Sequence, residues 1–196
     1  MSCTGLVLAA GSSRRLGSPK QLLLLEGRPL LELVVDKVNS SRLDDVLVVL
    51  GASADEIRAR VNFGRARTLV NADHATGMAS SLRAGLAALP DTVDRALIVL
   101  GDQPEISAAL LDGLLDLQES SGLPAAALSF NGLLHPPVVL KRELWGDLMS
   151  LEGDVGCRAV IRARPELVAR LAAVEDRNHP VDVDTLEDYQ RLTANR

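Results

Sequence analysis

A short stretch that follows an apolar run combines the residue types that bind a phosphate group. Residues 4–10 are almost entirely apolar, which predicts a buried strand, and this run opens directly into Gly11. Residues 11–20 then combine glycines and serines with two arginines and Lys20. Glycine lets backbone N–H groups approach an anion closely, and the cations neutralise its charge. A strand that feeds a small, cationic loop therefore predicts a phosphate-binding site.

This loop differs from two common phosphate-binding loops. A P-loop requires Gly-Lys-Ser/Thr at its end, whereas Gly17 is followed by Ser18 and the lysine comes later, at Lys20. A dinucleotide-binding fingerprint requires a second glycine where this chain has Ser13. The alternative is that the segment is only a solvated basic loop that follows a strand.

A single carboxylate marks the end of a later apolar run. Residues 96–100 predict another buried strand, and Asp102 follows this run after Gly101. A carboxylate at such a position can hold Mg²⁺, a hard ion that prefers oxygen ligands and retains waters and substrate phosphates. The alternative is that Asp102 caps a turn or the helix that follows.

A second source of carboxylates lies near the end of the chain. If residues 180–183 form a strand, Asp182 and Asp184 project to the same face, and either could complete a metal site with Asp102. The alternative is that Asp184 or Thr185 caps the last helix, with Asp188 in its first turn. Both roles can hold together, one aspartate for each, and the sequence does not choose between them.

Strands that alternate with helices are predicted to position these residues. The predicted strands are 4–10, 46–50, 68–70, 96–100, 125–129, 138–140, 167–174 and 180–183, and the predicted helices are 29–40, 53–61, 77–89, 107–118, 142–150, 156–163 and 186–192. This alternation favours right-handed βαβ units. We therefore predict an α/β chain with a three-layer Rossmann-like fold, in which helices cover both faces of a mainly parallel sheet. Ligands bind at the carboxyl ends of strands in such sheets.

The composition supports this fold class and argues against a nucleic-acid partner. The chain has 196 residues, which suits one domain over 1–196, and nearly half of them are apolar. Only four are aromatic, so the core must be aliphatic, as suits a sheet covered by helices: Phe63, Phe130, Trp145 and Tyr189. The net charge of −5, the absence of a basic run and the few aromatic residues exclude nucleic acid as an expected ligand.

Features that the sequence lacks predict the cellular location of the protein and argue against a zinc site. No apolar stretch approaches the roughly 18 residues of a membrane helix, so no membrane association is expected. The N-terminus runs directly into the first strand without a charged leader. Cys3 and Cys157 lie far apart and form no Cys-x-x-Cys pair, which indicates free thiols in a reducing cytoplasm and no zinc site.

The first loop resembles the signature L-A-A-G-x-S-x-R-x-G-x-x-K of the nucleotidyltransferases. Members of that family move a nucleoside monophosphate from an NTP onto a phosphate-bearing acceptor. Eight positions match at the correct spacing: Leu8, Ala9, Ala10, Gly11, Ser13, Arg15, Gly17 and Lys20.

Further motifs narrow the resemblance to the molybdenum cofactor cytidylyltransferase branch of that family. L-G-D-Q-P, G-M-x-x-S-L-x-x-G, H-P-x-x-L, G-D-x-G-x-R and D-x-D-T-x-E-D occur there in this order. The corresponding segments of this chain are 100–104, 77–85, 135–140, 153–158 and 182–188. At Ala10 the chain resembles the family members that use CTP. Relatives that use GTP on the same cofactor usually carry L-A-G-G, with glycine at this position.

The resemblance implies a role for each motif, with a nucleotide-binding half over about 1–105 and an acceptor-binding half over about 106–196. Arg15, Lys20 and Asp102 would be catalytic, and Asp102 with Asp182 or Asp184 would hold Mg²⁺. The residues implied to bind the nucleotide are Leu8, Ala9, Ala10, Gly11, Ser12, Ser13, Arg15, Lys20, Gly77, Ser81 and Gly101. Those implied to face the pterin acceptor are Gln103, His135, Asp154 and Arg158.

The sequence departs from the family pattern on the acceptor side. Leu134 precedes His135 where the family usually has glycine, Pro137 doubles the proline, and Cys157 stands where alanine is usual. The alternative for His135 is a hydrogen-bonded loop histidine without contact to the acceptor.

By this resemblance, the reaction is attack by the terminal phosphate of molybdopterin, carrying molybdenum, on the α-phosphorus of CTP, with release of pyrophosphate. A molybdenum hydroxylase would be the client enzyme. One alternative is transfer from GTP or another NTP, to the same cofactor or to a sugar or polyol phosphate. An alternative of another class is a non-catalytic carrier or maturation factor that holds the cofactor without consuming an NTP.

Overall fold

Short apolar runs of the sequence form the strands of a seven-stranded sheet in the computed structural model, which describes residues 1–13, 18–172 and 182–194. The order in this sheet is β5-β4-β1-β6-β8-β7-β9. Its strands are β1 (Cys3–Ala9), β4 (Asp45–Leu50), β5 (Arg67–Val70), β6 (Arg95–Leu100), β7 (Ala125–Phe130), β8 (Leu133–Lys141) and β9 (Val168–Ala172). A separate small hairpin consists of β2 (Leu24–Leu25) and β3 (Arg28–Pro29).

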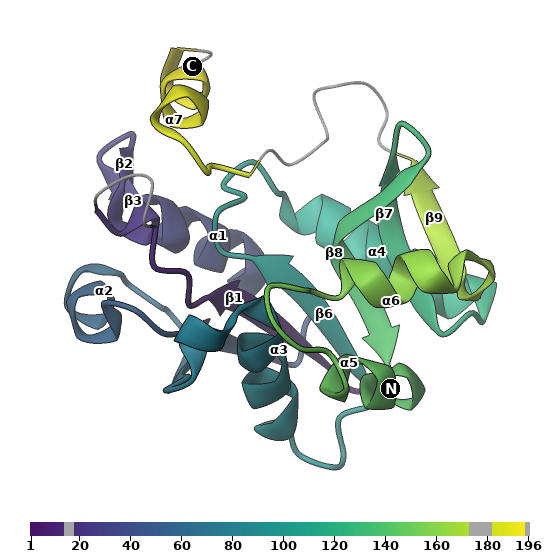
Figure 1. Cartoon of the computed structure of the whole chain (residues 1–196). Coiled ribbons are helices and arrows are strands. Elements are labelled where there is room, and N and C mark those ends of the chain that lie inside the picture. The colour runs from purple at the N-terminus through teal and green to yellow at the C-terminus, as the bar shows by residue number, and fades with distance from the viewer. Residues whose placement is uncertain (14–17, 173–181, 195–196) are drawn as a thin grey trace.

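Helices cover both faces of this sheet, so the predicted three-layer α/β architecture is confirmed (Figure 1). The α-helices are α1 (Leu30–Asn39), α2 (Ala54–Arg60), α3 (Met78–Ala87), α4 (Ala108–Ser121), α5 (Trp145–Met149), α6 (Arg158–Ala163) and α7 (Leu186–Ala194). Short 3₁₀ helices are η1 (Lys20–Leu22), η2 (His74–Thr76), η3 (Arg142–Leu144) and η4 (Pro165–Leu167).

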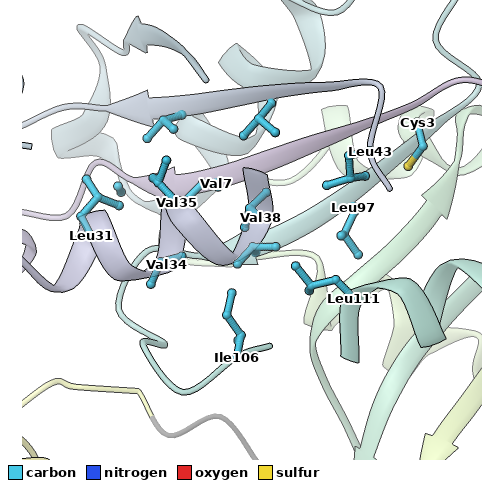
Figure 2. Close-up of a cluster of buried hydrophobic side chains, with 14 of the residues drawn as sticks. Cys3, Val7, Leu31, Val34, Val35, Val38, Leu43, Leu97, Ile106 and Leu111 are labelled. Carbon is cyan, nitrogen blue, oxygen red and sulfur yellow. The ribbon is translucent and has the colours of Figure 1, made fainter. Parts of the chain in front are cut away.

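Alternation along the strands divides the core into two clusters. Leu6 and Leu8 of β1 pack with α3, α5 and α6 on one face, whereas Val7 and Ala9 pack with α1, α2 and α4 on the other. Figure 2 shows Val35 of α1 beside Val7 of β1 within this second cluster. Successive side chains of a strand point to opposite faces, so a strand buried on both faces must be apolar throughout. This requirement explains the continuous apolar runs.

The strand order places a topological switch point beside β1. β1 pairs in parallel with β4 on one side and with β6 on the other, and β4 pairs in parallel with β5. The chain therefore moves outward from β1 to β5 and then returns to the opposite side of β1 as β6. A crevice forms at the carboxyl ends of the strands where the winding direction changes. Here the crevice lies between the ends of β1 and β6.

The sheet is mixed in its second half. β8 pairs antiparallel with both β6 and β7, whereas β7 and β9 are parallel. The strand predicted at 138–140 begins earlier, at Leu133, and passes through Pro136 and Pro137. Proline cannot donate to a ladder, and the β7 register shifts between Ala127 and Leu128 at this point. This irregularity lies beside the two prolines, which precede the strand predicted from the sequence.

Two further predictions from the sequence need correction. The strand predicted at 180–183 is absent where the structure describes it, because residues 182–184 form no strand and positions 180–181 lie outside the described residues. The helix predicted at 53–61 is shorter, because α2 spans Ala54–Arg60; Ser53, which precedes it, has a φ of 57° and makes no capping hydrogen bond. The error at 180–183 comes from the assumption that an apolar pair adopts its commonest local role.

Among the described residues, no helix is both long and apolar enough to cross a membrane. Cys3 and Cys157 are free and buried, one beneath each face of the sheet. Burial raises the pKa of each thiol to about 12, so both side chains are neutral parts of the core.

Truncation of a fully buried leucine tests the assignment of the core. Leu97 of β6 has no exposed surface, so Leu97→Ala removes buried methyl groups and leaves a cavity. We expect this variant to lose about 2–5 kcal/mol of unfolding free energy, measured by urea denaturation. Leu133→Ala is the matched control, because the Leu133 side chain is 52% exposed and its loss should change stability by about 0.5 kcal/mol or less. Equal losses in the two variants would contradict the assignment.

Candidate functional site

A cavity of about 730 Å³ occupies the crevice at the carboxyl ends of β1 and β6. Leu8 of β1 is in register with Leu100 of β6, and the Gly101 N–H donates to the Leu8 carbonyl at 2.9 Å. This register sets the two loops that follow these strands side by side. The cavity is lined by Leu8, Ala9, Ala10, Gly11, Ser12, Ser13, Lys20, Gln21, His74, Ala75, Thr76, Gly77, Met78, Ser81, Leu100, Gly101, Asp102, Asp154, Asp182 and Asp184.

The loop after β1 returns to the site through η1. Ser13 has a φ of 49°, and its hydroxyl oxygen accepts a hydrogen bond from the Lys20 N–H at 2.8 Å. This bond ties the two sides of the loop together, although residues 14–17 between them lie outside the described part of the chain. The tie fixes the backbone from which the Lys20 side chain reaches the cavity.

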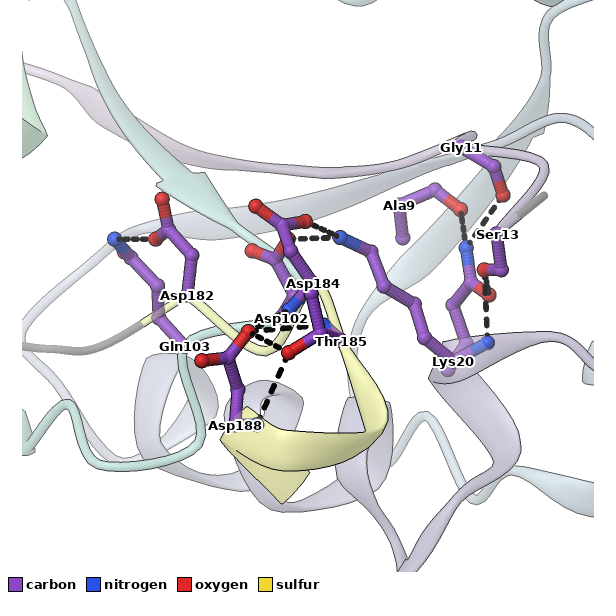
Figure 3. Close-up of polar contacts among 11 residues, drawn as sticks. Ala9, Gly11, Ser13, Lys20, Asp102, Gln103, Asp182, Asp184, Thr185 and Asp188 are labelled. Carbon is purple, nitrogen blue, oxygen red and sulfur yellow. Dashed lines mark hydrogen bonds and ion pairs between the residues drawn. The ribbon is translucent and has the colours of Figure 1, made fainter. Parts of the chain in front are cut away.

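Lys20 joins the two ends of the chain in one charge cluster (Figure 3). Its ammonium forms a short ion pair with Asp102 and a second ion pair with Asp184 at 2.9 Å. The side chains of Lys20 and Asp102 are 17% and 14% exposed, whereas that of Asp184 is 54% exposed. The cationic loop and the strand-end carboxylate predicted from the sequence therefore meet.

Burial and charge shift the pKa values of this pair. Burial raises the pKa of the Asp102 carboxyl above its usual value; the Lys20 ammonium opposes this shift, and the negative charges of Asp182 and Asp184 add to it. Burial lowers the pKa of Lys20, but Asp102 and Asp184 outweigh it and hold that pKa above its usual value. Lys20 is therefore a stable cation, and the crowded carboxylates would gain from more positive charge.

Residues of the cavity fit a hard cation in part. Oδ1 of Asp102 is buried and has no hydrogen-bond partner among the described residues, so one oxygen of this carboxylate is available. Within the same residues, no group of three or more His, Cys, Asp or Glu side chains is arranged to hold an ion alone. One or two carboxylates are enough for Mg²⁺ when substrate phosphates supply the remaining ligands.

Asp182 and Asp184 have different partners. Asp182 Oδ1 accepts from Gln103 Nε2 at 2.7 Å, whereas Asp184 shares Lys20 with Asp102. The two aspartates lie in an irregular segment and not on the strand predicted there, so a common strand face does not relate them. The Val183 N–H donates to the Asp102 carbonyl at 3.1 Å, and this bond holds the segment against the end of β6.

The capping alternatives for the aspartates are decided by hydrogen bonds. Thr185 caps α7, because its hydroxyl accepts from the Asp188 N–H at 3.1 Å and Asp188 accepts in return from the Thr185 N–H at 2.9 Å. Asp102 does not cap α4, since Ser107 does so through the Leu110 N–H. Neither Asp102 nor Asp184 is needed as a helix cap, and the side chains of both pair with Lys20.

The opposite wall of the cavity is the beginning of α3. Gly77 has a φ of 113°, and a Cβ there would lie 2.2 Å from the Gly153 carbonyl carbon. The Ala79 N–H donates to the Gly153 carbonyl at 3.1 Å, so the loop that contains Asp154 rests on this helix. Asn71, which is buried, donates to the Ser81 hydroxyl at 3.1 Å and fixes its orientation.

The acceptor residues implied by the sequence are only partly gathered here. Asp154 lines the cavity, whereas Gln103, His135 and Arg158 are not among its lining residues. Gln103 is buried behind Asp182, His135 lies on β8, and Arg158 begins α6. Arg15, implied to be catalytic and to bind the nucleotide, lies outside the described residues.

Sequence reasoning missed several residues of the cavity, namely Gln21, His74, Ala75, Thr76, Met78 and Leu100. His74, Ala75 and Thr76 form η2, a short turn without a periodic apolar signal. Gln21 lies next to Lys20, and this adjacency to a predicted site residue was the one signal that could have found it.

Comparisons with known families agree with this geometry. Residues 5–173 match the family described as the MobA-like NTP transferase domain. The chain is also 37% identical over 202 residues to nicotine blue oxidoreductase of Paenarthrobacter nicotinovorans, which covers 96% of this chain and 95% of that protein.

Solved structures share the fold over almost the whole chain. One is the homologue of Mycobacterium tuberculosis Rv0371c from Mycobacterium sp. strain JC1, with 34% identity, a TM-score of 0.87 and coverage of 98% and 96% of the two chains. Another is Rv0371c of M. tuberculosis H37Rv in complex with manganese, with 28% identity, a TM-score of 0.86 and full coverage of both chains.

Substitution of Gly77 tests the contact between α3 and the loop that contains Asp154. In Gly77→Ala the new methyl group collides with the backbone of Gly153, so the hydrogen bond from Ala79 to Gly153 should break. We expect the Ala79 amide to exchange with solvent roughly fivefold faster or more, as measured by NMR hydrogen exchange. Gly132→Ala is the control, because Gly132 also has a positive φ but nothing lies within 4 Å of its Cβ position. Unchanged Ala79 protection in Gly77→Ala would contradict the contact.

Proposed function

The chain belongs to the MobA-like NTP transferase family, and within it we propose a Mg²⁺-dependent cytidylyltransferase that moves CMP from CTP onto the terminal phosphate of molybdopterin. The acceptor carries molybdenum, and the products are pyrophosphate and the cytosine dinucleotide form of the cofactor. CTP is proposed because the sequence of the first loop resembles that of the CTP users at Ala10.

One observation carries the proposal, namely the contact between Lys20 and Asp102. Nucleotidyl transfer requires a cation for the triphosphate and a carboxylate for a divalent ion within one site. Here both come from loops that follow neighbouring parallel strands and line the same cavity as Gly11 and Ser12. A carrier that only held the cofactor would need neither group, so this contact favours an enzyme.

Nucleotidyl transfer requires that the two substrates are positioned for reaction and that their negative charges are compensated. A phosphate monoester is already an anionic nucleophile, so its oxygen can form the new bond to the α-phosphorus without a strong general base. As the bond from that phosphorus to the bridging oxygen breaks, negative charge grows on the departing pyrophosphate. Lys20 is the described side chain that can stabilise this charge, and Arg15 is proposed as a second cation by resemblance.

Charge in the cavity explains why a divalent ion is part of the proposal. Among the described residues, four carboxylates, those of Asp102, Asp154, Asp182 and Asp184, line it beside the ammonium of Lys20. A triphosphate is repelled by such a wall unless more positive charge is added. Asp102, with its free buried oxygen, and Asp184 would hold Mg²⁺, which when bound neutralises phosphate oxygens and polarises the reacting phosphoryl group. The manganese complex of Rv0371c supports a divalent ion in this fold.

The proposal also covers the acceptor side of the cavity and the cellular setting of the reaction. Asp154 is the acceptor residue that lines the cavity, and it accepts from the Met78 N–H at 3.4 Å. We propose that the loop of residues 153–158 faces the pterin, that the product passes to a molybdenum hydroxylase, and that the protein works in the cytoplasm. Gln103, His135 and Arg158 remain predictions from resemblance.

One experiment separates the candidate substrates. The protein is incubated with Mg²⁺, molybdopterin that carries molybdenum, and CTP or GTP separately; pyrophosphate is measured and the dinucleotide is identified by mass. We expect product from CTP. Product from GTP alone would replace the nucleotide in the proposal, and turnover only with a sugar or polyol phosphate would replace the acceptor. Binding of molybdopterin without NTP consumption would instead indicate a carrier.

A second candidate function follows from the nicotine blue oxidoreductase relative, which is 37% identical to this chain. An oxidoreductase would consume a redox cofactor in place of an NTP. A reaction mixture with a reduced nicotinamide dinucleotide and nicotine blue tests this candidate by loss of nicotinamide absorbance. Pyrophosphate release without such oxidation favours the transferase.

Removal of the Lys20 ammonium should impair the chemical step. We expect Lys20→Ala to lower kcat/KM for CTP by about 100–1000-fold, the usual cost of one electrostatic donor, as measured by pyrophosphate release. Lys37→Ala is the control, because Lys37 is an exposed lysine of α1. Turnover by a folded Lys20→Ala protein within about threefold of the original would refute the role of Lys20.

Removal of the Asp102 charge should abolish the response to divalent ions. We expect Asp102→Asn to lose Mg²⁺-dependent turnover and to bind Mn²⁺ in the presence of CTP at least about tenfold more weakly by calorimetry, since it loses one anionic ligand. Asp55→Asn, at an exposed position of α2, should behave like the original protein. Undiminished Mn²⁺ binding by Asp102→Asn would reject this residue as a ligand.

A further inference from the structure

Gln21 is a buried glutamine beside the loop that follows β1. Its side chain is almost fully enclosed, and Nε2 donates to the Ala9 carbonyl at 2.9 Å and to the Gly11 carbonyl at 3.0 Å. Both bonds are drawn in Figure 3, where they end on the labelled Ala9 and Gly11. An amide nitrogen has two N–H donors, so a single group can bridge carbonyls that lie two residues apart.

The carbonyl between these two also has a protein donor. Ala10 accepts from the Ala52 N–H at 3.4 Å, so three successive carbonyls of the loop are engaged by the surrounding protein. In a planar trans peptide the N–H points opposite to the preceding carbonyl. The N–H of Gly11 therefore points away from Ala52 and that of Ser12 away from Gln21, and both residues line the cavity.

The same side chain also contacts the next turn of the loop. Its Oε1 accepts from the Ser13 hydroxyl at 3.4 Å, and Ser13 in turn accepts from the Lys20 N–H. Gln21 thus fixes the loop at both sides while adding no charge to a cavity that must hold a polyanion.

We propose that Gln21 is a positioning residue that holds the backbone N–H groups of Gly11 and Ser12 in the orientation that binds the triphosphate. The inference rests on the proposed function, because it concerns how the nucleotide site is prepared. Gln21 does not touch the reacting atoms. Its contribution is to turn the loop carbonyls away from the phosphates.

Another buried glutamine provides a matched control. Gln118 of α4 has no exposed surface; its Nε2 donates to the Leu123 carbonyl at 2.8 Å and its Oε1 accepts from Arg95. Gln118 therefore also binds a backbone carbonyl through its side-chain amide, but it does not line the cavity. Gln118→Met therefore reports what the loss of a buried amide costs in stability alone.

The test compares Gln21→Met with Gln118→Met in the full chain. Binding of CTP and of inorganic tripolyphosphate, each with Mg²⁺, is measured by calorimetry, and exchange of the amides of Gly11 and Ser12 is measured by NMR. We expect Gln21→Met to bind both ligands roughly tenfold to thirtyfold more weakly, the equivalent of two lost hydrogen bonds, and to exchange these amides faster. Gln118→Met should lower the unfolding midpoint but keep both affinities within about twofold.

The inference and the proposed function fail in different ways. If Gln21→Met binds as tightly as the original protein, or if its loop amides keep their protection, the positioning role is overturned while the transferase proposal stands. If the original protein itself binds neither CTP nor tripolyphosphate, the proposed function fails, and the inference fails with it. Gln21→Asn, which keeps an amide on a shorter side chain, is used if Gln21→Met does not fold. Failure of both variants to fold would show a structural role and overturn the inference.

Discussion

The site depends on a cluster of charges at the ends of two parallel strands, in which two carboxylates pair with one ammonium and a third carboxylate lies nearby. Like charges repel strongly when they are removed from water, so Asp102, Asp182 and Asp184 can share a partly buried site only if positive charge accompanies them. Lys20 supplies that charge in the structure. The same electrostatic demand makes the site receptive to a divalent ion and, through it, to phosphates.

Strand register brings these groups together. Because β1 and β6 are adjacent and parallel, their carboxyl ends meet at one edge of the sheet, and the loops that follow them leave side by side. The helices that cover both faces make this arrangement rigid, since each strand of the central part is apolar on both sides. The core therefore does more than stabilise the chain, because it fixes the distance between a cationic loop and a carboxylate.

Much of this could be predicted from the sequence, for physical reasons. Strands buried on both faces must be continuously apolar, which marked 4–10, 46–50 and 96–100 and showed that Asp102 follows a strand end. The mixed second half was harder, because β8 contains two prolines and the segment around Asp182 is irregular. Two roles could not be predicted from sequence patterns and follow from hydrogen bonds in the structure: Thr185 caps α7, and Gln21 holds the loop after β1. Such roles depend on which backbone atoms lie nearby, and a linear sequence does not record that.

The wide separation along the chain of the two aspartates that share Lys20 has a consequence for biosynthesis. Asp184 is held near Lys20 by the Val183 bond to Asp102 and by the docking of α7 on the β2–β3 hairpin, where the Tyr189 hydroxyl donates to the Leu24 carbonyl. A nascent chain that has left the ribosome up to α6 already contains Lys20 and Asp102, but it lacks the second carboxylate. The charge balance of the pocket is thus completed only after all seven strands of the described sheet have been synthesised.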